Sequence, residues 1–344
     1  MAPLFKIALI QFEPKPVDVE ANFAYAAAAL RDAAAAGARL AVLPEYHLTS
    51  WVPDHPDFVA ACAASGAYLP RYQALAKELD LCIAPGTIVE AHAVTDAATD
   101  AVDAADATKT LVTVADAAHG PFELRNMAYC LAAGTGAVLG RYQKTNLWHP
   151  ERPHLVAPTA ASAVGWPPHT AFDLPWTWPA SGDNDNKGGR PVRAGLLVCW
   201  DLAFPEAFRA LVADGADLII VSSFWHPTTD VDAVALAHNP DCEVLFLRSA
   251  LTARAYENTC AVAFCNACGL SQLAQPLVGG RGEVAPGTNA TSLVDLDLDL
   301  LAVAEGNYRV RADMRRPGWH YAHTLAVPGG TKTAKTEAAA KAAD

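Results

Sequence analysis

The sequence predicts an α/β fold, and two observations support this prediction. Apolar strand-like segments alternate with helix-like segments along the 344 residues. The strand-like segments are continuous apolar runs without a polar face, which is typical of strands covered by helices on both sides. Hydrophobic residues make up 52% of the chain, so it has enough apolar side chains to build a core of this kind.

The N-terminal part begins with a buried strand over residues 5–12, and an alanine-rich helix over 21–38 follows it. A second strand stops at Pro44. A helix around 68–80 then precedes a strand over 81–90. The order of these elements is strand, helix, strand, helix, strand.

The middle of the chain contains two expected surface insertions. Residues 91–108 are rich in Ala, Asp and Thr with little periodicity, which predicts an insertion inside a hairpin. A strand over 111–117 and two strands within 124–144, with a turn at Gly134–Gly136, follow. The second insertion spans about 155–190 and includes a short strand and a polar, glycine-rich hairpin tip.

The C-terminal part continues the alternation, and no shift in composition divides the chain. We therefore predict a single domain over 1–328 and a low-complexity tail over 329–344. The elements expected in this part are strands over 192–201, 216–225 and 260–269, helices over 204–215 and 242–259, a turn over 279–287 and strand-like alternation over 292–305.

Charge and apolar run length exclude several classes of partner. The net charge of −12 and the pI of about 5.3 argue against a nucleic-acid-binding surface, which needs a basic face. No apolar run approaches the ~20 residues that span a bilayer. The start of the chain is expected to be a strand and not a signal peptide, and the eight cysteines are expected to be reduced thiols of a cytoplasmic protein.

Charged or nucleophilic side chains follow three of the apolar runs. Glu45, Lys144 and Cys199 each stand where a predicted strand ends. A carboxylate can act as a base, a cation can stabilise a thiolate or an oxyanion, and a thiol can attack a polarised carbon. Each residue taken singly is also consistent with a structural role, a core thiol or a solvated loop residue.

Three segments surround these residues, and they stand along the chain in the order "LPEYHLTSW", "GRYQKTNLW" and "GLLVCWDLAFPEAFRAL". Together they resemble the nitrilase superfamily of carbon–nitrogen hydrolases. The resemblance extends over nearly the whole chain outside the insertions, and it implies a four-layer αββα sandwich. It also implies a catalytic set of Glu45, Lys144 and Cys199 that uses no metal or cofactor, and a homodimer or larger homo-oligomer.

Further residues match the family pattern one by one. Glu151, seven positions after Lys144, matches a second glutamate that positions substrate and lysine in several branches. The backbone N–H of Trp200 is expected to be a second oxyanion donor. Structural roles are expected for Asn126 in its strand and for Asp201 and Glu206 beside the nucleophile.

The sequence also suggests where substrate binds. Four aromatic residues are expected to line a pocket for an apolar or aromatic acyl group: Trp148, Trp200, Trp225 and Tyr46. The Pro/Trp-rich stretch 148–166 is a candidate lid over it. The C-x-x-C pair Cys265 and Cys268 lacks the second pair or histidine cluster of a metal site, so we expect it to be structural.

The resemblance leaves three functions open. Asp201 and the following Phe-Pro-Glu favour an amidase that releases ammonia or an amine from a small amide through a Cys199 thioester. Trp200 and Glu151-Arg152 favour a nitrilase instead. A catalytically silent member that acts as a binding or assembly module is the third alternative. A carbamoyl-amino-acid substrate ranks lower, because no paired arginines stand beside Cys199.

Overall fold

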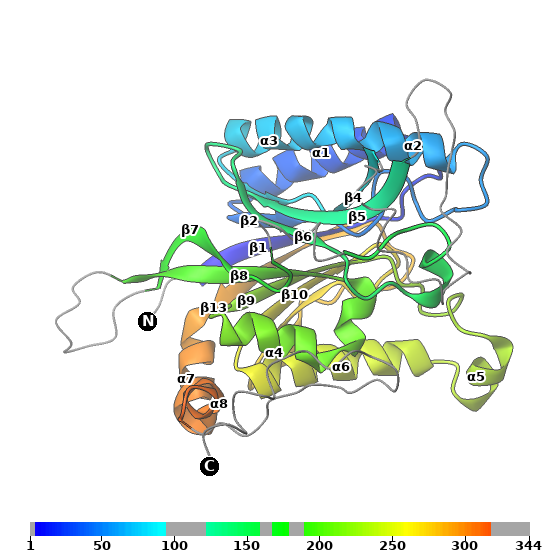
Figure 1. Ribbon diagram of the computed structural model, residues 1–344. Helices are drawn as coiled ribbons and strands as arrows, with labels where there is room; N and C mark the ends of the chain where they lie inside the picture. The colour runs from blue at the N-terminus through cyan, green and yellow to red at the C-terminus, as the bar shows by residue number, and fades with distance from the viewer. Residues whose placement is uncertain (1–3, 94–121, 159–166, 179–188, 318–344) are drawn as a thin grey trace, which may run out of the picture.

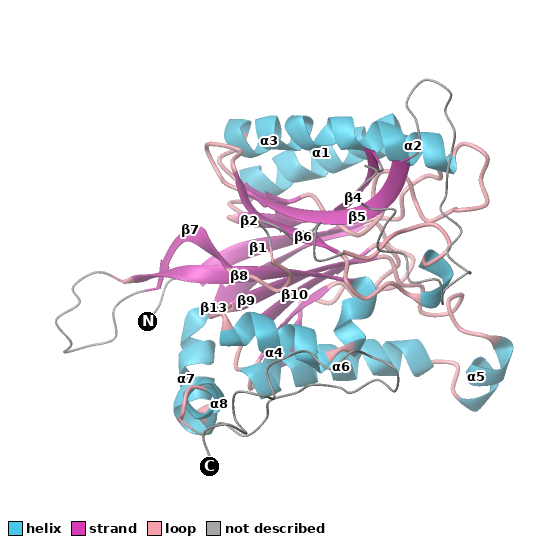
Figure 2. Ribbon diagram, in the orientation of Figure 1, coloured by secondary structure: helices cyan, strands magenta, loops and turns pink. Residues whose placement is uncertain are grey.

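The protein forms a sandwich of four layers in the computed structural model, which describes residues 4–93, 122–158, 167–178 and 189–317. Two β-sheets face each other, and helices cover the outer face of each sheet (Figure 1). Figure 2 shows the same order of layers by secondary structure. The predicted four-layer αββα sandwich is therefore confirmed.

The first sheet has seven strands, and β1 and β2 lie side by side near its middle. The strand order is β13-β1-β2-β3-β5-β4, with β6 paired to β5. β1 runs parallel to β2 and antiparallel to β13. The strands of this sheet are β1 (Leu4–Gln11), β2 (Leu40–Val42), β3 (Cys82–Ala84), β4 (Thr87–Ala93), β5 (Phe122–Leu131), β6 (Val138–Gln143) and β13 (Ala290–Asp297).

The second sheet has six strands in the order β12-β11-β10-β9-β8-β7. Its central strands β8, β9 and β10 are parallel, so their carboxyl ends meet at one edge. The strands are β7 (Phe172–Trp178), β8 (Arg190–Val198), β9 (Leu218–Ser223), β10 (Ala261–Asn266), β11 (Gln272–Gln275) and β12 (Gly279–Arg281).

The helices pack on the outer faces of the two sheets (Figure 1). α1 (Val19–Ala35), α2 (Phe58–Ser65) and α3 (Leu69–Glu78) lie over the first sheet, and α4 (Pro205–Ala213) and α6 (Cys242–Asn258) lie over the second. Asp18 caps α1 by accepting from the Ala21 N–H. The remaining helices are α5 (Ala233–His238), α7 (Leu298–Tyr308) and α8 (Val310–Met314).

The central strands of the first sheet, β1, β2 and β3, are buried on both faces over nearly their whole length, as their continuous apolar runs predict. Ile7 and Leu9 belong to the core between the sheets, whereas Ala8 and Ile10 pack with helix residues of the outer layer such as Leu30. Successive side chains of a strand point to opposite faces, so an apolar residue at every position is what this architecture requires.

Three predicted elements differ from the structure. The alternation over 292–305 is strand only as far as Asp297, whose side chain then accepts from the Asp299 N–H and caps α7. Leu298, Leu301 and Ala304 follow at helical spacing and are buried. The predicted strand 81–90 is broken into β3 and β4, and the predicted turn over 279–287 begins with the short strand β12.

Part of the predicted organisation lies outside the described residues. Three predicted parts fall there: the strand over 111–117, the tail over 329–344 and most of the insertion over 91–108. β4 and β5 pair antiparallel on either side of that first insertion. Of the second predicted insertion, 155–190, the described part includes β7, an edge strand of the second sheet. The single-domain boundary of 1–328 stays a prediction.

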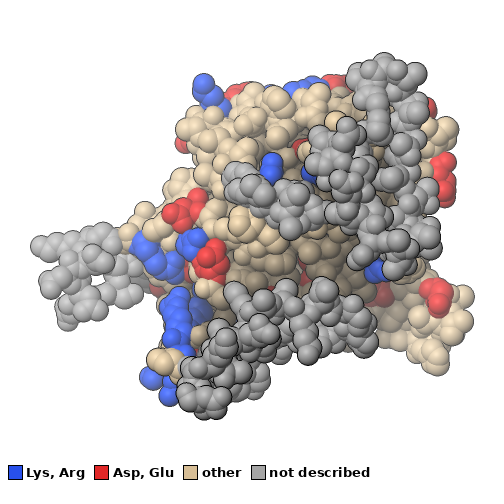
Figure 3. All heavy atoms as spheres, in the orientation of Figure 1, with Lys and Arg blue, Asp and Glu red and all other residues tan. Residues whose placement is uncertain are grey.

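Arginines on one side of the second sheet are paired with acidic side chains. Arg190 donates to Asp217 at 2.7 and 2.8 Å, and Arg311 also lies 3.8 Å from Asp217. Figure 3 shows other places on the face in view where basic and acidic side chains stand next to each other. Within the described ranges, no helix has the length and apolar character needed to cross a membrane.

Candidate active site

Glu45, Lys144 and Cys199 each lie within three residues of the end of a strand, and the strands belong to the two facing sheets. Glu45 comes after β2 and Lys144 after β6 in the first sheet, and Cys199 comes after β8 in the second. The sheets are also joined here through the end of β9, since the Glu45 N–H donates to Ser223 O at 3.3 Å. The three residues that the sequence singled out are therefore brought together.

A glycine allows the chain to approach Glu45 closely. Gly86, between β3 and β4, has a φ of +78°, and a Cβ there would lie 2.1 Å from the backbone oxygen of Pro44. Only glycine fits both the left-handed conformation and this distance. The break in the predicted strand 81–90 thus belongs to the packing around the site.

The Glu45 carboxylate is completely buried and accepts hydrogen bonds on both oxygens. Lys144 Nζ and Asn126 Nδ2 donate to Oε1 at 2.8 and 2.9 Å, and the Phe224 N–H donates to Oε2 at 3.0 Å. Burial and the nearby Glu151 raise the pKa of Glu45 to about 7, against the lowering effect of Lys144. A proton affinity of this size is the one that a general base needs at neutral pH.

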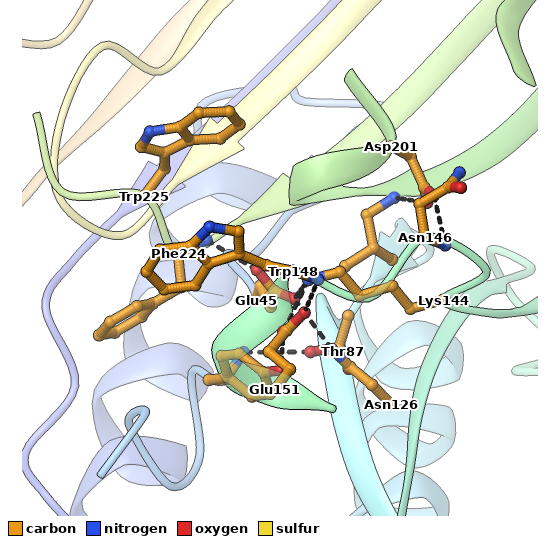
Figure 4. A network of polar contacts seen from close by, with 12 residues as sticks. Glu45, Thr87, Asn126, Lys144, Asn146, Trp148, Glu151, Asp201, Phe224 and Trp225 are labelled. Atoms are coloured by element: carbon orange, nitrogen blue, oxygen red, sulfur yellow. Dashed lines mark hydrogen bonds and ion pairs between the residues drawn. The ribbon is translucent and has the colours of Figure 1, made fainter. Parts of the chain in front are cut away.

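Lys144 lies between two carboxylates. Its ammonium donates to Glu45 Oε1 at 2.8 Å and to Glu151 Oε1 at 2.7 Å, and all three side chains are nearly inaccessible. Figure 4 shows these side chains converging from separate segments. Burial opposes the charge on Lys144, but the two carboxylates outweigh it and raise the pKa of the ammonium. Lys144 thus stays cationic.

Glu151 lies in a short 3₁₀ turn over His149–Glu151 and is held by neighbours on both oxygens. Tyr46, next to Glu45 in the chain, donates its hydroxyl to Oε1, and the Trp148 N–H donates to Oε2 at 2.7 Å. These contacts fix the carboxylate against Lys144. The prediction that Glu151 positions the lysine therefore has a geometric basis.

Cys199 opens a 3₁₀ turn over Cys199–Ala203 directly after β8. Its φ is +44°, a left-handed conformation that costs a non-glycine residue energy and is typical of functional positions. The residue is 8% exposed, and the Glu45 carboxylate lies near enough to the thiol for each group to affect the pKa of the other. Burial, followed by the charge of Glu45, raises the pKa of Cys199, and Lys144 only partly offsets this. The resting sulfur is therefore protonated.

Asp201 joins the Cys199 turn to the segment that carries Lys144. Its carboxylate accepts from the Val198 N–H and the Tyr142 hydroxyl, both at 2.9 Å. It also accepts from Asn146 twice, from the backbone N–H at 3.1 Å and from Nδ2 at 2.8 Å. Tyr142 and Asn146 flank Lys144, so this buried carboxylate ties the two sheets' strand ends together (Figure 4). Glu206, by contrast, is exposed in the first turn of α4.

The four aromatic residues expected in a pocket have different surroundings. The Trp200 and Trp225 rings pack at a centroid distance of 5.4 Å, and Trp225 Nε1 donates to Glu243 at 2.5 Å. Tyr46 is buried with its hydroxyl on Glu151, and Trp148 contributes its backbone N–H to the same carboxylate. Their contact with substrate stays a prediction. Residues 159–166 of the candidate lid lie outside the described part of the chain.

Among the described residues, no group of three or more His, Cys, Asp or Glu side chains is arranged to hold a metal ion. Cys265 is buried with its thiol donating to the backbone oxygens of Ile10 and Val42. Cys268 is buried as well, and both thiols are free. These surroundings agree with a structural role for the pair.

Sequence reasoning gave little weight to several residues that surround the site. Asn126 donates directly to the carboxylate of Glu45, beyond the structural role in its strand that was expected. Tyr142, Asn146 and Ser223 were not singled out. Their positions in the sequence could have indicated them, because each of the three residues lies within three residues of the end of a predicted strand.

A family model described as carbon–nitrogen hydrolase matches residues 6–305, which is most of the chain. The chain therefore belongs to the carbon–nitrogen hydrolase family. The resemblance found in the three strand-end segments is confirmed, and with it the assignment to a family of enzymes. Among relatives of this family, an (R)-stereoselective amidase from a Pseudomonas species is 28% identical over 184 residues. A deaminated glutathione amidase from Bos taurus is 27% identical over 265 residues.

The matched parts cover 51% of this chain and 54% of the Pseudomonas amidase, and 76% of this chain and 65% of the Bos taurus amidase. The chain thus spans about half the length of the first relative and about two thirds of the second.

Solved structures of the nitrilase superfamily share the fold. The chain is similar to an amidase from Nesterenkonia sp., with a TM-score of 0.58 and 22% identity over 88% of this chain and 96% of that one. Saccharomyces cerevisiae Nit3 gives a TM-score of 0.62 at 18% identity, over 91% of this chain and 97% of that one. These structures agree with the αββα architecture described above.

Proposed function

We propose that the protein is an amidase, which hydrolyses the carbon–nitrogen bond of a small amide through a thioester on Cys199. The observation that carries the proposal is the buried cluster of Glu45, Lys144 and Glu151 beside the Cys199 thiol. Burying three ionised side chains is costly, and their arrangement supplies a base, a cation and a nucleophile in one place. The amidase activities named for the Pseudomonas and Bos taurus relatives support the same reaction class.

The first half-reaction forms the thioester. Glu45 takes the proton of Cys199, and the sulfur attacks the carbonyl carbon while the carbonyl π electrons move onto oxygen. Lys144 Nζ and the Trp200 N–H stabilise this oxyanion. When the intermediate collapses, the carbon–nitrogen bond breaks and Glu45 returns its proton to the leaving ammonia or amine.

The second half-reaction releases the acid. Glu45 takes a proton from water as the water oxygen attacks the thioester carbon. The carbon–sulfur bond then breaks, and the sulfur recovers a proton by way of Glu45. Because the resting thiol is protonated, both halves depend on the same carboxylate. No metal or cofactor is required, and the substrate is expected to be the small-molecule partner.

A nitrile substrate is the second candidate, and the position of Trp200 directly after Cys199 favours it. Release of ammonia from a panel of aliphatic and aromatic amides, nitriles and carbamoyl compounds tests the choice. The proposal predicts ammonia release from one or more amides at a higher kcat/KM than from the matching nitriles. Turnover of nitriles without amides would reverse the assignment. No turnover, together with uniform slow alkylation of all thiols, would favour a silent binding module.

A further inference from the structure

Ser223, the last residue of β9, carries a buried hydroxyl without an ordinary partner. Its side chain is 0% exposed, and within the described part of the chain its Oγ makes no hydrogen bond of normal geometry. Its backbone, in contrast, is firmly held, since Ser223 O accepts from the Glu45 N–H and from the Ala267 N–H at 3.0 Å. The backbone of Ser223 is therefore held beside Glu45, and its buried hydroxyl is left to donate to another acceptor.

Strand register brings Ser223 next to Cys199 along the two neighbouring segments. β8 and β9 are parallel with Val198 opposite Ser222, and the next residues are Cys199, which opens the 3₁₀ turn, and Ser223, which ends β9. Burial and then the charge of Glu45 raise the pKa of the Cys199 thiol, and the nearby Ser223 hydroxyl acts in the opposite direction. The charges that act on the same thiol are those of Glu45, Lys144 and Glu151. Ser223 is the neutral donor of the set.

A buried hydroxyl without a partner costs free energy, so its presence calls for an explanation. A protonated thiol is a weak acceptor, whereas a thiolate accepts strongly. The contact between Ser223 and Cys199 therefore strengthens when negative charge develops on sulfur. An interaction that is stronger in the transition state than in the resting enzyme is one that accelerates a reaction.

We propose that Ser223 is a further catalytic residue, whose hydroxyl donates to the Cys199 sulfur while that sulfur carries negative charge. The proposal deepens the proposed function and rests on Cys199 being its nucleophile. The proposal also assigns different roles to two adjacent serines. Ser222 Oγ donates to Leu43 O at 2.9 Å and so has a structural partner. The acceptor that we propose for the Ser223 hydroxyl is the sulfur of Cys199.

The test compares Ser223→Ala with Ser222→Ala as the matched control. Iodoacetamide is added at about pH 8, and the alkylation rate of Cys199 is followed by peptide mass spectrometry. We expect Ser223→Ala to alkylate about tenfold more slowly at Cys199, equivalent to one unit of thiol pKa, with an unchanged melting temperature. We expect Ser222→Ala to melt at a lower temperature and to alkylate at the wild-type rate.

Alkylation needs no substrate, so this result is independent of the amidase assignment. An unchanged alkylation rate in Ser223→Ala, or an equal loss in both variants, would overturn the role of Ser223 even if amides are hydrolysed. If the protein hydrolyses none of the tested amides but Ser223→Ala still slows alkylation, the proposed function fails and the role of Ser223 at the sulfur stands. With an amide that is turned over, Ser223→Ala lowers kcat and leaves KM unchanged.

Discussion

The Lys144 ammonium donates to Glu151 Oε1 across 2.7 Å, and both side chains are almost fully buried. Glu45 lies on the other side of the same ammonium at 2.8 Å. One buried cation thus faces two carboxylates, and the charge of Glu151 raises the pKa of Glu45. The affinity of the base for a proton is therefore set by the whole cluster and not by Glu45 alone.

Replacing Glu151 with Gln tests this coupling. Removing the charge of Glu151 lowers the pKa of Glu45, so we expect the acid limb of kcat/KM to move to lower pH. Because Lys144 loses an anchor, kcat is expected to fall about 10²-fold, as for the loss of one oxyanion donor. Glu206→Gln, at an exposed site in α4, is the control and should match the wild type. An acid limb that does not move in Glu151→Gln contradicts the coupling.

The pKa of Glu45, raised to about 7, predicts the pH dependence of the enzyme. A base acts only when deprotonated, so activity is lost as pH falls through the pKa of Glu45. We expect an acid limb in kcat/KM with a midpoint near pH 7. Glu45→Gln should lower kcat by about 10²- to 10⁴-fold and abolish this limb. Persistence of the same limb in Glu45→Gln would assign it to another group.

Lys144→Met should destabilise the protein as well as inactivate it. The substitution leaves the carboxylates of Glu45 and Glu151 buried without their cation, which costs about 3–5 kcal/mol. Urea denaturation at neutral pH measures this loss, and Lys15→Met at an exposed position is the control. The loss should shrink on acidification, because protonated carboxyls no longer need a cation. An equal loss at neutral and acidic pH would refute the electrostatic explanation.

Asp201→Asn should weaken the connection between the Cys199 turn and the Lys144 segment. Both oxygens of Asp201 accept from donors, so an amide nitrogen in place of one oxygen faces donors it cannot accept from. We expect a loss of about 1–3 kcal/mol in stability and a lower kcat. Asp232→Asn at the N-cap of α5 is the control, with activity retained. Full activity in Asp201→Asn would show that the connection is not needed.

The positions of Glu45, Lys144 and Cys199 could be predicted because each follows an apolar run that the sequence displays directly. The contact of Asn126 with Glu45 and the position of Ser223 beside Cys199 could not. The first depends on the pairing of β5 with strands of the β2 side of the sheet, which are distant from it in the chain, and the second depends on the register between the consecutive strands β8 and β9. Strand register supplied this information, and a single sequence does not contain it.

The boundary between β13 and α7 shows a different limit. Leucines and aspartates alternate up to Leu300, and this pattern indicates a strand. The helix nevertheless begins at Leu298, because Asp297 caps it and the apolar residues that follow it fit a helical face as well. Where two periodicities overlap, the cap decides the boundary.

The most direct test of the central claim is the mass of the protein during turnover of an amide. Acid quenching should trap an acyl adduct, and peptide mapping should place it on Cys199. Cys199→Ala should show neither adduct nor turnover while keeping the wild-type melting temperature, and Cys268→Ala, a buried thiol outside the cluster, should show both. Turnover by Cys199→Ala, or an adduct that maps to another residue, would contradict the account.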